Sequence, residues 1–195
     1  MEIKKIWLIG LTILIIGLSS SLGFAKGFQN EPDGFRGIKW GTDIKTIPGM
    51  KYLITYENLS IYSRDKDKLF FGNAKVGAIE YIFYKDKFSA VRIHTDGAKE
   101  FKTFRDAIFK EYGNSSHLGK HGNISNWAWR GKITDMVLEY NLSNKETIFH
   151  MWSVEMEEEI EKEFVKSITE SLKRKKMTKK YRKQIQILKF IKLKN

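Results

Sequence analysis

The stretch from residue 76 to residue 95 constrains the fold more than any other part of the chain. Residues 76–84 and 88–95 are both rich in β-branched and aromatic side chains, and the polar residues Lys85, Asp86 and Lys87 separate them. Two such runs around a short polar turn indicate an antiparallel hairpin. Because side chains alternate between the two faces of a strand, we expect Ile79, Tyr81 and Phe83 to share one face of the first strand. Val91 and Ile93 should share one face of the second strand.

A helix is predicted directly after this hairpin. Asp96 and Gly97 interrupt the second strand, and apolar side chains then recur at helical spacing through residues 98–112. Gly113 is a suitable residue for the end of that helix. The apolar positions, which we expect to face the sheet, are Phe101, Phe104, Ile108, Phe109 and Tyr112.

Further strands are predicted on both sides of the hairpin and helix. Two short β-prone runs precede them at residues 52–56 and 59–62, and three more strands follow at 124–130, 133–142 and 147–153. The Gly-, Asn- and Ser-rich stretch 113–122 indicates a loop. This order predicts an α+β fold, in which an antiparallel sheet has one helix packed on a face.

The C-terminal part has a different character. From Glu155 onward, Ile160, Phe164, Ile168 and Leu172 recur every four residues, which predicts a long helix with an acidic start and a basic end. Residues 171–195 hold 11 Lys or Arg and no Asp or Glu, whereas residues 26–170 hold 22 of each sign. The net charge of +12 therefore comes mainly from a basic tail. A neutral body argues against a nucleic-acid groove.

The N-terminus has the pattern of an export signal. Lys4 and Lys5 precede an uncharged apolar run over residues 6–18, and Gly23 and Ala25 place small residues at −3 and −1 of a cleavage site after Ala25. The alternative interpretation is an uncleaved membrane anchor. We therefore predict three segments: a signal peptide at 1–25, an α+β domain at 26–153, and a C-terminal helix with a basic tail at 154–195. The expected location is the periplasm or the exterior, with membrane association as a further option.

The sequence has no recognisable catalytic motif. Cysteine is absent, which excludes disulfides and a lipoprotein anchor, and neither a Gly-x-Ser-x-Gly elbow nor a Walker-type loop occurs. His117 and His121 have the spacing of two metal ligands on a helix, but they lie in the predicted loop with no Cys, Asp or Glu near them. We predict no cofactor, no metal site and no catalytic residues.

Two groups of residues are candidates for binding. Trp127 and Trp129 share one face of a predicted strand, and Trp152 lies on a nearby strand. Exposed, the three rings would form a stacking platform, whereas buried they would pack in the core against the predicted helix. The second group is the start of the basic tail, Lys173, Arg174, Lys175 and Lys176, which would attract an anionic membrane surface or an acidic protein partner. Its alternative is a solvated helix end.

Several segments, taken in order, resemble a group of small exported bacterial proteins, of proteobacterial type and of unknown function. These segments are Phe35-Arg36-Gly37-Ile38-Lys39-Trp40-Gly41-Thr42, residues 79–88 (IEYIFYKDKF), residues 109–113 (FKEYG), residues 129–131 (WRG) and residues 138–140 (LEY). The resemblance implies an envelope location and an α+β fold, and it brings no catalytic residues.

The export signal, the basic tail and the lack of a catalytic motif together favour a non-enzymatic function. The leading hypothesis is an exported envelope protein that acts as a binding or adaptor domain for a protein or the membrane surface, without nucleic acid as a partner. An envelope hydrolase that lacks a readable motif, and an inhibitor of an envelope enzyme, are the alternatives.

Overall fold

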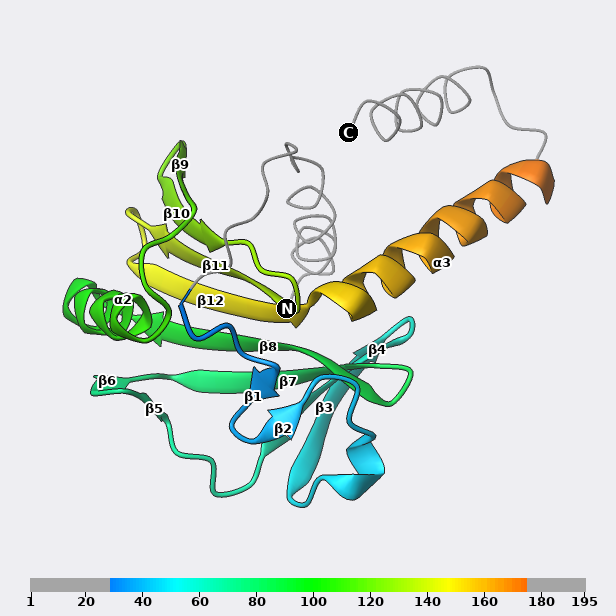
Figure 1. Cartoon of the computed structure of the whole chain (residues 1–195), viewed down its shortest axis with the longest axis horizontal. Helices are drawn as coiled ribbons and strands as arrows, with labels where there is room; N and C mark the ends of the chain where they lie inside the picture. The colour runs from blue at the N-terminus through cyan, green and yellow to red at the C-terminus, as the bar shows by residue number, and fades with distance from the viewer. Residues whose placement is uncertain (1–28, 175–195) are drawn as a thin grey trace. The chain divides into compact units, whose positions relative to one another are not determined.

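A computed structural model describes residues 29–174 and shows the α+β fold that the sequence predicts (Figure 1). Its centre is an eight-stranded antiparallel sheet with the order β3-β4-β7-β8-β12-β11-β10-β9. The strands are β3 (Met50–Tyr56), β4 (Leu59–Arg64), β7 (Ala78–Tyr84), β8 (Lys87–Asp96), β9 (His117–His121), β10 (Ile124–Trp129), β11 (Thr134–Asn141) and β12 (Glu146–Ser153).

The β7–β8 hairpin confirms the strongest prediction from the sequence. Its turn residues Lys85 and Asp86 both have positive φ angles, 48° and 64°, which fits the right-handed twist of the two strands. The apolar sets predicted for the two strands lie on the same side of the sheet and are buried in the core cluster of the molecule. We call this side of the sheet the core face, and it carries Ile79, Tyr81, Phe83, Val91, Ile93, Phe149 and Met151.

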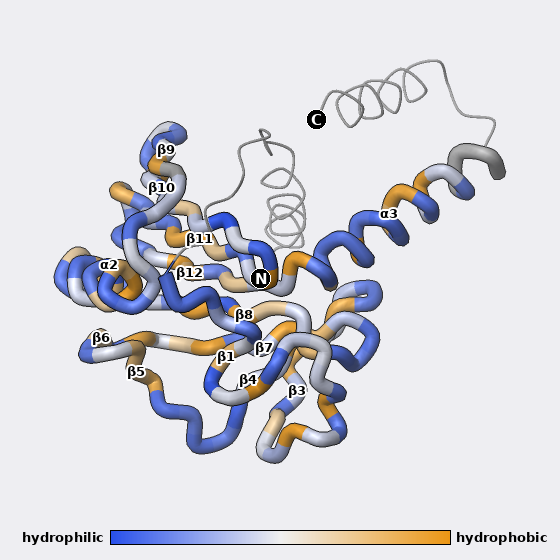
Figure 2. Tube along the Cα trace, viewed as in Figure 1, coloured by the Kyte–Doolittle hydropathy of each residue, from blue (hydrophilic) through white to orange (hydrophobic). Residues whose placement is uncertain are grey.

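Helix α2 (Ala98–Tyr112) also forms where the sequence predicts it and lies beside β8 and β12 (Figure 1). Hydrophobic and hydrophilic residues alternate along its turns (Figure 2), and the buried ones face the sheet. Phe101 stacks on Tyr140 with 3.9 Å between ring centroids, and Phe104 meets Phe149 edge-on at 5.8 Å. Gly113 ends the helix with a φ of 78°, a conformation that glycine adopts without strain.

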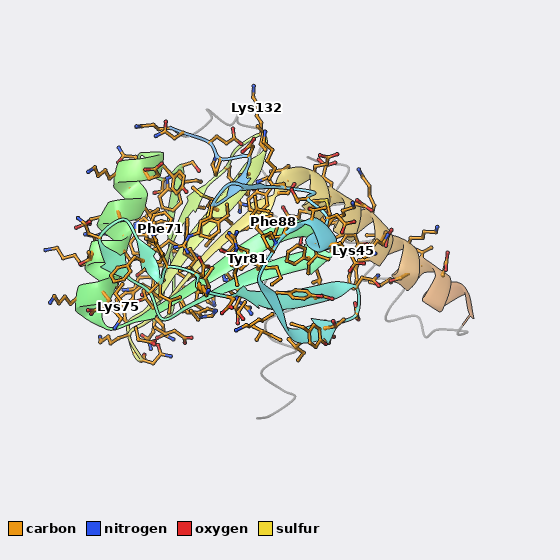
Figure 3. All side chains as sticks on the ribbon, turned by 90° about the horizontal axis from the view of Figure 1, so that it is seen from below. Lys45, Phe71, Lys75, Tyr81, Phe88 and Lys132 are labelled. Carbon is orange, nitrogen blue, oxygen red and sulfur yellow. The ribbon has the colours of Figure 1, made fainter. Side chains whose placement is uncertain are left out.

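The remainder of the core face lies under short elements that the sequence did not indicate. These are β1 (Gly34–Phe35), β2 (Ile38–Lys39), a 3₁₀ turn η2 (Ile44–Thr46), β5 (Phe70–Phe71) and β6 (Ala74–Lys75). Phe35 packs on Tyr81, and Trp40 packs on Phe88 with 4.8 Å between centroids. Figure 3 shows Tyr81 and Phe88 among the interior side chains and Lys132 pointing outward.

The prediction of a loop over residues 113–122 is wrong in its second half. Residues His117–His121 form β9, which pairs with β10 across the turn at Gly122 and forms one edge of the sheet. Gly122 has a φ of 58° and allows that turn. The backbone pairing with β10 decides the conformation, although glycine and polar residues carry no strand signal of their own.

The opposite edge strand, β3, contains a bulge. Tyr52 pairs with Tyr62 and Ile54 pairs with Ile61, so that Leu53 is an extra residue with no partner on β4. A bulge of this kind interrupts the regular ladder and changes which face the following side chains occupy.

The long C-terminal helix α3 (Val154–Arg174) starts directly after β12. The chain divides into two compact units, one of which is Ala25–Lys166; the described end of the helix, residues 167–174, belongs to the other. The first turns of α3 therefore belong to the same unit as the sheet. Within the described part of the chain, no helix is both long and apolar enough to span a membrane.

Candidate functional site

The structure places the three candidate tryptophans on two different faces of the sheet. Trp129 is fully buried on the core face, where it packs edge-on against Phe109 and donates its indole N–H to the carbonyl of Gly113 at 3.0 Å. Trp127 is partly buried on the same face, 5.6 Å from Phe101. Trp152 follows Met151 on β12 and lies on the other face. The three rings therefore do not form one stacking platform.

The second group of candidates lies at the limit of the described residues. Lys173 and Arg174 are the last two residues of α3, and Lys175 and Lys176 lie outside the described residues, as does the predicted signal segment 1–25. The predicted binding of the tail to an anionic surface stays a prediction.

His117 and His121 stand at the two ends of strand β9. Positions four apart on a strand are separated by about 13 Å, whereas on a helix they would be neighbours, so the helical spacing of two metal ligands does not apply here. Among residues 29–174, no group of three or more His, Asp or Glu side chains is arranged to hold a metal ion.

Ionisable side chains gather on the face of the sheet opposite the core face, which we call the second face. The strand register brings Glu80, Arg92 and His150 side by side across β7, β8 and β12. Both Nε and Nη2 of Arg92 lie 2.5 Å from Oε2 of Glu80, and Nε2 of His94 lies 3.4 Å from the same oxygen. We call these four residues, Glu80, Arg92, His94 and His150, the polar cluster.

In the polar cluster, the opposite charges of Glu80 and Arg92 neutralise each other. Burial by itself would raise the pKa of Glu80, but the hydrogen bond with His94 and the charge of Arg92 outweigh it and hold that pKa at about 2. Burial lowers the pKa of His150 to about 3, and the neighbouring Arg92 and His94 act in the same direction. A carboxylate with so low a pKa is a weak general base. Within residues 29–174, no serine or threonine hydroxyl hydrogen-bonds to either histidine.

A second set of ionisable groups lies where α3 begins. Oε2 of Glu157 accepts a hydrogen bond from the indole N–H of Trp152 at 2.5 Å, and Arg130 forms a 2.6 Å ion pair with Asp135. Burial raises the pKa of Glu157 to about 7, and Asp135 and Glu161 raise it while the indole hydrogen bond and Arg130 lower it. Tyr84 and Lys85 at the β7–β8 turn both contact Glu163. These contacts fasten the first turns of α3 to the sheet.

Strand β3 carries four of the exposed large apolar side chains of the described residues. The exposed fractions are 60% for Tyr52, 51% for Leu53, 47% for Ile54 and 40% for Tyr56. These four residues, which we call the β3 edge surface, are consecutive apart from Thr55 and lie on a strand that pairs only with β4 among the described strands. The sequence predicts a strand at residues 52–56 but not its exposure, because an apolar run has the same pattern at the edge and at the centre of a sheet.

Comparisons of the chain with protein families, with curated proteins and with solved structures found no match.

Proposed function

We propose that this chain is an exported, non-enzymatic binding or adaptor domain, and that a protein partner docks on the β3 edge surface. One observation carries the proposal: four large apolar side chains, each at least 40% exposed, are gathered on one edge strand. Single exposed apolar residues are ordinary, but several large ones gathered on one edge strand are typical of an interaction site. The bulge puts Tyr52 on the face of Tyr62 and Ile54 on the face of Ile61, so the β3 edge surface wraps around the edge of the sheet.

The chemistry of the patch favours contact through side chains. Tyrosine is enriched in the buried centres of protein interfaces because it combines a large apolar area with a polar end. The bulge at Leu53 disturbs the backbone ladder of β3, so a partner strand cannot pair along its whole length. We therefore expect the partner to present an apolar surface that wraps around this edge and contacts side chains on both faces, Tyr52 on one and Ile54 and Tyr56 on the other.

The ionisable groups elsewhere in the structure support binding over catalysis. Glu80 is committed to Arg92 and His94, and Asp135 is committed to Arg130. A hydrolase would need a nucleophile or a bound water held by a base, and that base in turn held by a third group. The described residues show ion pairs in place of such a chain of contacts.

Export and the basic tail complete the proposal. The n-region, apolar run and small-residue cleavage site at 1–25 support export, and the resemblance to small exported bacterial proteins supports an envelope location. The 11 basic residues beyond position 170 support contact of the tail with anionic lipid or an acidic protein. Intact-mass measurement of the protein from the envelope tests export. We expect the mass of a chain that begins at Lys26, whereas a chain in the membrane fraction that still begins at Met1 would contradict cleavage.

The docking proposal is tested by a matched pair of double substitutions. Leu53→Asp with Ile54→Asp places two charges on the β3 edge surface. Leu118→Asp with Ile133→Asp makes the same two changes at residues that are 66% and 48% exposed elsewhere. Proteins from the producing cell's envelope are crosslinked to the wild type and to each variant and identified by mass spectrometry.

We expect a crosslinked species that the wild type and the control variant share and that the β3 variant loses. The same species on all three proteins would overturn the β3 edge surface as the docking site. Equal thermal melting of the two variants is required, so that a folding defect is not mistaken for lost binding.

A further inference from the structure

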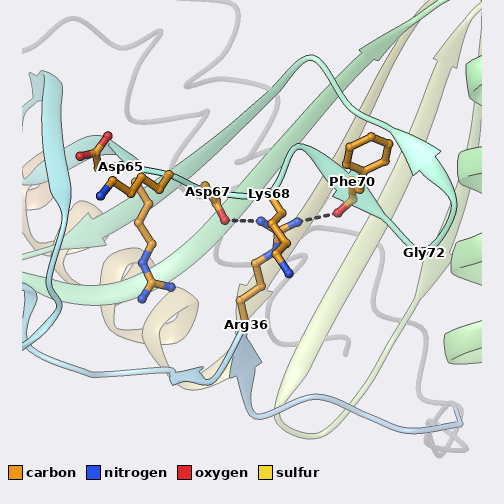
Figure 4. Close-up of a pocket in the computed structure, with 8 residues that line it drawn as sticks. Arg36, Asp65, Asp67, Lys68, Phe70 and Gly72 are labelled. Atoms are coloured by element: carbon orange, nitrogen blue, oxygen red, sulfur yellow. Dashed lines mark hydrogen bonds and ion pairs between the residues drawn. The ribbon is translucent and has the colours of Figure 1, made fainter.

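A surface hollow of about 540 Å³ lies between the β1–β2 turn and the loop that joins β4 to β5 (Figure 4). It is independent of the β3 edge surface, since none of those four residues lines it. Charged side chains dominate its lining, which consists of Arg36, Arg64, Asp65, Lys66, Asp67, Lys68, Phe70 and Gly72.

Side-chain hydrogen bonds and an ion pair fix the wall of this hollow. The guanidinium of Arg36 forms an ion pair with Asp67 and donates a second hydrogen bond to the carbonyl of Phe70 at 2.6 Å (Figure 4). The fully buried Tyr81 donates its hydroxyl to Oδ2 of Asp67 at 2.7 Å, and burial together with this bond raises the pKa of Tyr81. The loop is therefore tied both to the β1–β2 turn and to the core, so that its side chains leave from a fixed backbone.

Both carboxylates in the lining already have cationic partners. Asp67 is held by Arg36, and Asp65 lies 2.9 Å from Nζ of Lys51. The other three cations of the lining, Arg64, Lys66 and Lys68, form no ion pair with any residue in the described range 29–174. Three cations without an ion-pair partner in that range therefore line one hollow, and an anion that entered would be attracted by all three.

We propose that this hollow binds a small organic phosphate. A phosphate monoester carries close to two negative charges at neutral pH and three acceptor oxygens, which matches three cationic donors better than a carboxylate with one charge and two oxygens. The volume is within the range of small-molecule sites and exceeds what a phosphate group fills. The ring of Phe70, 54% exposed at the wall, provides an apolar surface for the organic part.

The test uses the purified protein with its tail intact and phenyl phosphate as the probe, followed by calorimetry. Inorganic phosphate, which lacks the ring, and benzoate, which has a carboxylate in place of the phosphate, are the comparison ligands. We expect phenyl phosphate to bind most tightly, inorganic phosphate less tightly, and benzoate least. Phe70→Ser should reduce the affinity for phenyl phosphate to that for inorganic phosphate.

A charge-matched pair of variants locates the site. The triple substitution Arg64→Gln, Lys66→Gln and Lys68→Gln removes three charges from the hollow, and Lys99→Gln, Lys102→Gln and Lys110→Gln removes three from α2. The hollow variant should bind phenyl phosphate at least about tenfold more weakly, while the α2 variant keeps the wild-type affinity. Equal weakening in both variants, or benzoate binding as tightly as phenyl phosphate, would overturn the proposal.

The phosphate could belong to a soluble compound or to a lipid headgroup, and the same variants distinguish the two sources. Sedimentation with vesicles containing phosphatidic acid, reduced only in the hollow variant, assigns the phosphate to a lipid. Weaker binding of phenyl phosphate, confined to the hollow variant and without that vesicle effect, assigns it to a soluble ligand. If neither effect is seen, the proposal is wrong. Because all the proteins carry the same tail, the contribution of the tail cancels.

Discussion

The two faces of the sheet are stabilised by different physics, although the same strands build both. The core face is lined by aromatic and aliphatic side chains that pack against α2 and the short N-terminal elements. The second face holds Glu80, Arg92, His94 and His150 in a network of charges. Apolar burial is non-directional and does not depend on protonation, whereas an ion pair requires both partners to be charged. The contribution of the core face to the free energy of unfolding should therefore be insensitive to pH. The contribution of the second face should change with pH.

The largest effect is expected from Phe104→Ala on the core face. Phe104 is fully buried and meets Phe71 and Phe149 edge-on, at 5.4 and 5.8 Å between ring centroids. Removal of the ring leaves a cavity between α2 and β12 and should lower the free energy of unfolding by about 3–5 kcal/mol. Urea denaturation measures the loss. Phe70→Ala is the matched control. Because that ring is 54% exposed, its removal should lower the free energy of unfolding far less.

A smaller loss is expected from Arg92→Ala on the second face. Arg92 is the main cationic partner of Glu80, whose side chain is 24% exposed, so the substitution leaves a carboxylate that is mostly buried with only His94 beside it. We expect a loss of about 2–3 kcal/mol at neutral pH. The double variant with Glu80→Gln should recover part of this loss, because the stranded charge is then gone. The single variant Glu80→Gln completes the comparison. If the free energies of unfolding lost in the two single variants add up to the loss in the double variant, Arg92 and Glu80 are not coupled.

His150 should contribute a pH dependence that the core face lacks. Its pKa in the folded protein is about 3, below the ordinary value of 6.5, so the unfolded chain binds the proton more readily between these two values. Stability should therefore fall as the pH falls from about 6.5 towards 3. His150→Gln should reduce the change in unfolding free energy between pH 6.5 and 4.5 by roughly 1–2 kcal/mol, a value discounted for the partial exposure of the ring. An unchanged slope would contradict the role of this histidine.

Glu157 should show the opposite sign and the smallest effect. Its folded pKa of about 7 lies above the ordinary value of 4.5, so the folded protein binds the proton more readily between these values and loses stability as the pH rises through 7. At pH 8, Glu157→Gln should stabilise the protein by about 1 kcal/mol, since the amide keeps an acceptor for Trp152 without the buried charge. At pH 4 the two proteins should have equal stability, as thermal melts at the two values would show.

The two faces of the sheet also differ in how well the sequence predicts them. The core face was predictable, because alternation in residues 76–95 and helical spacing in residues 98–112 identify which side chains are buried. The polar cluster on the second face could not be predicted from the sequence. Counting outward from the pairs Tyr84–Lys87 and Phe83–Phe88 would align Glu80 with Val91, but a register shift after Ile82 aligns it with Arg92. An irregularity of one residue moves a side chain to the other face, and no local sequence signal marks it.

Exposure was the second property that the sequence did not reveal. Residues 52–56 and 79–83 are both apolar β-prone runs, yet one lies at an edge of the sheet and the other at its centre. Which run is covered depends on strand order, a long-range property. The hollow was missed for a related reason: the two contacts of Arg36 in its wall, with Asp67 and the Phe70 carbonyl, lie more than 30 positions away.

The bulge at Leu53 has a consequence for the chain in a crowded compartment. An antiparallel sheet with an accessible edge is a template on which identical copies stack without limit, and fibres grow in this way. The extra residue puts the two halves of β3 out of phase with each other, so a second copy cannot continue the backbone ladder past the midpoint of the strand. The bulge at Leu53 therefore limits edge-to-edge pairing of identical copies through β3.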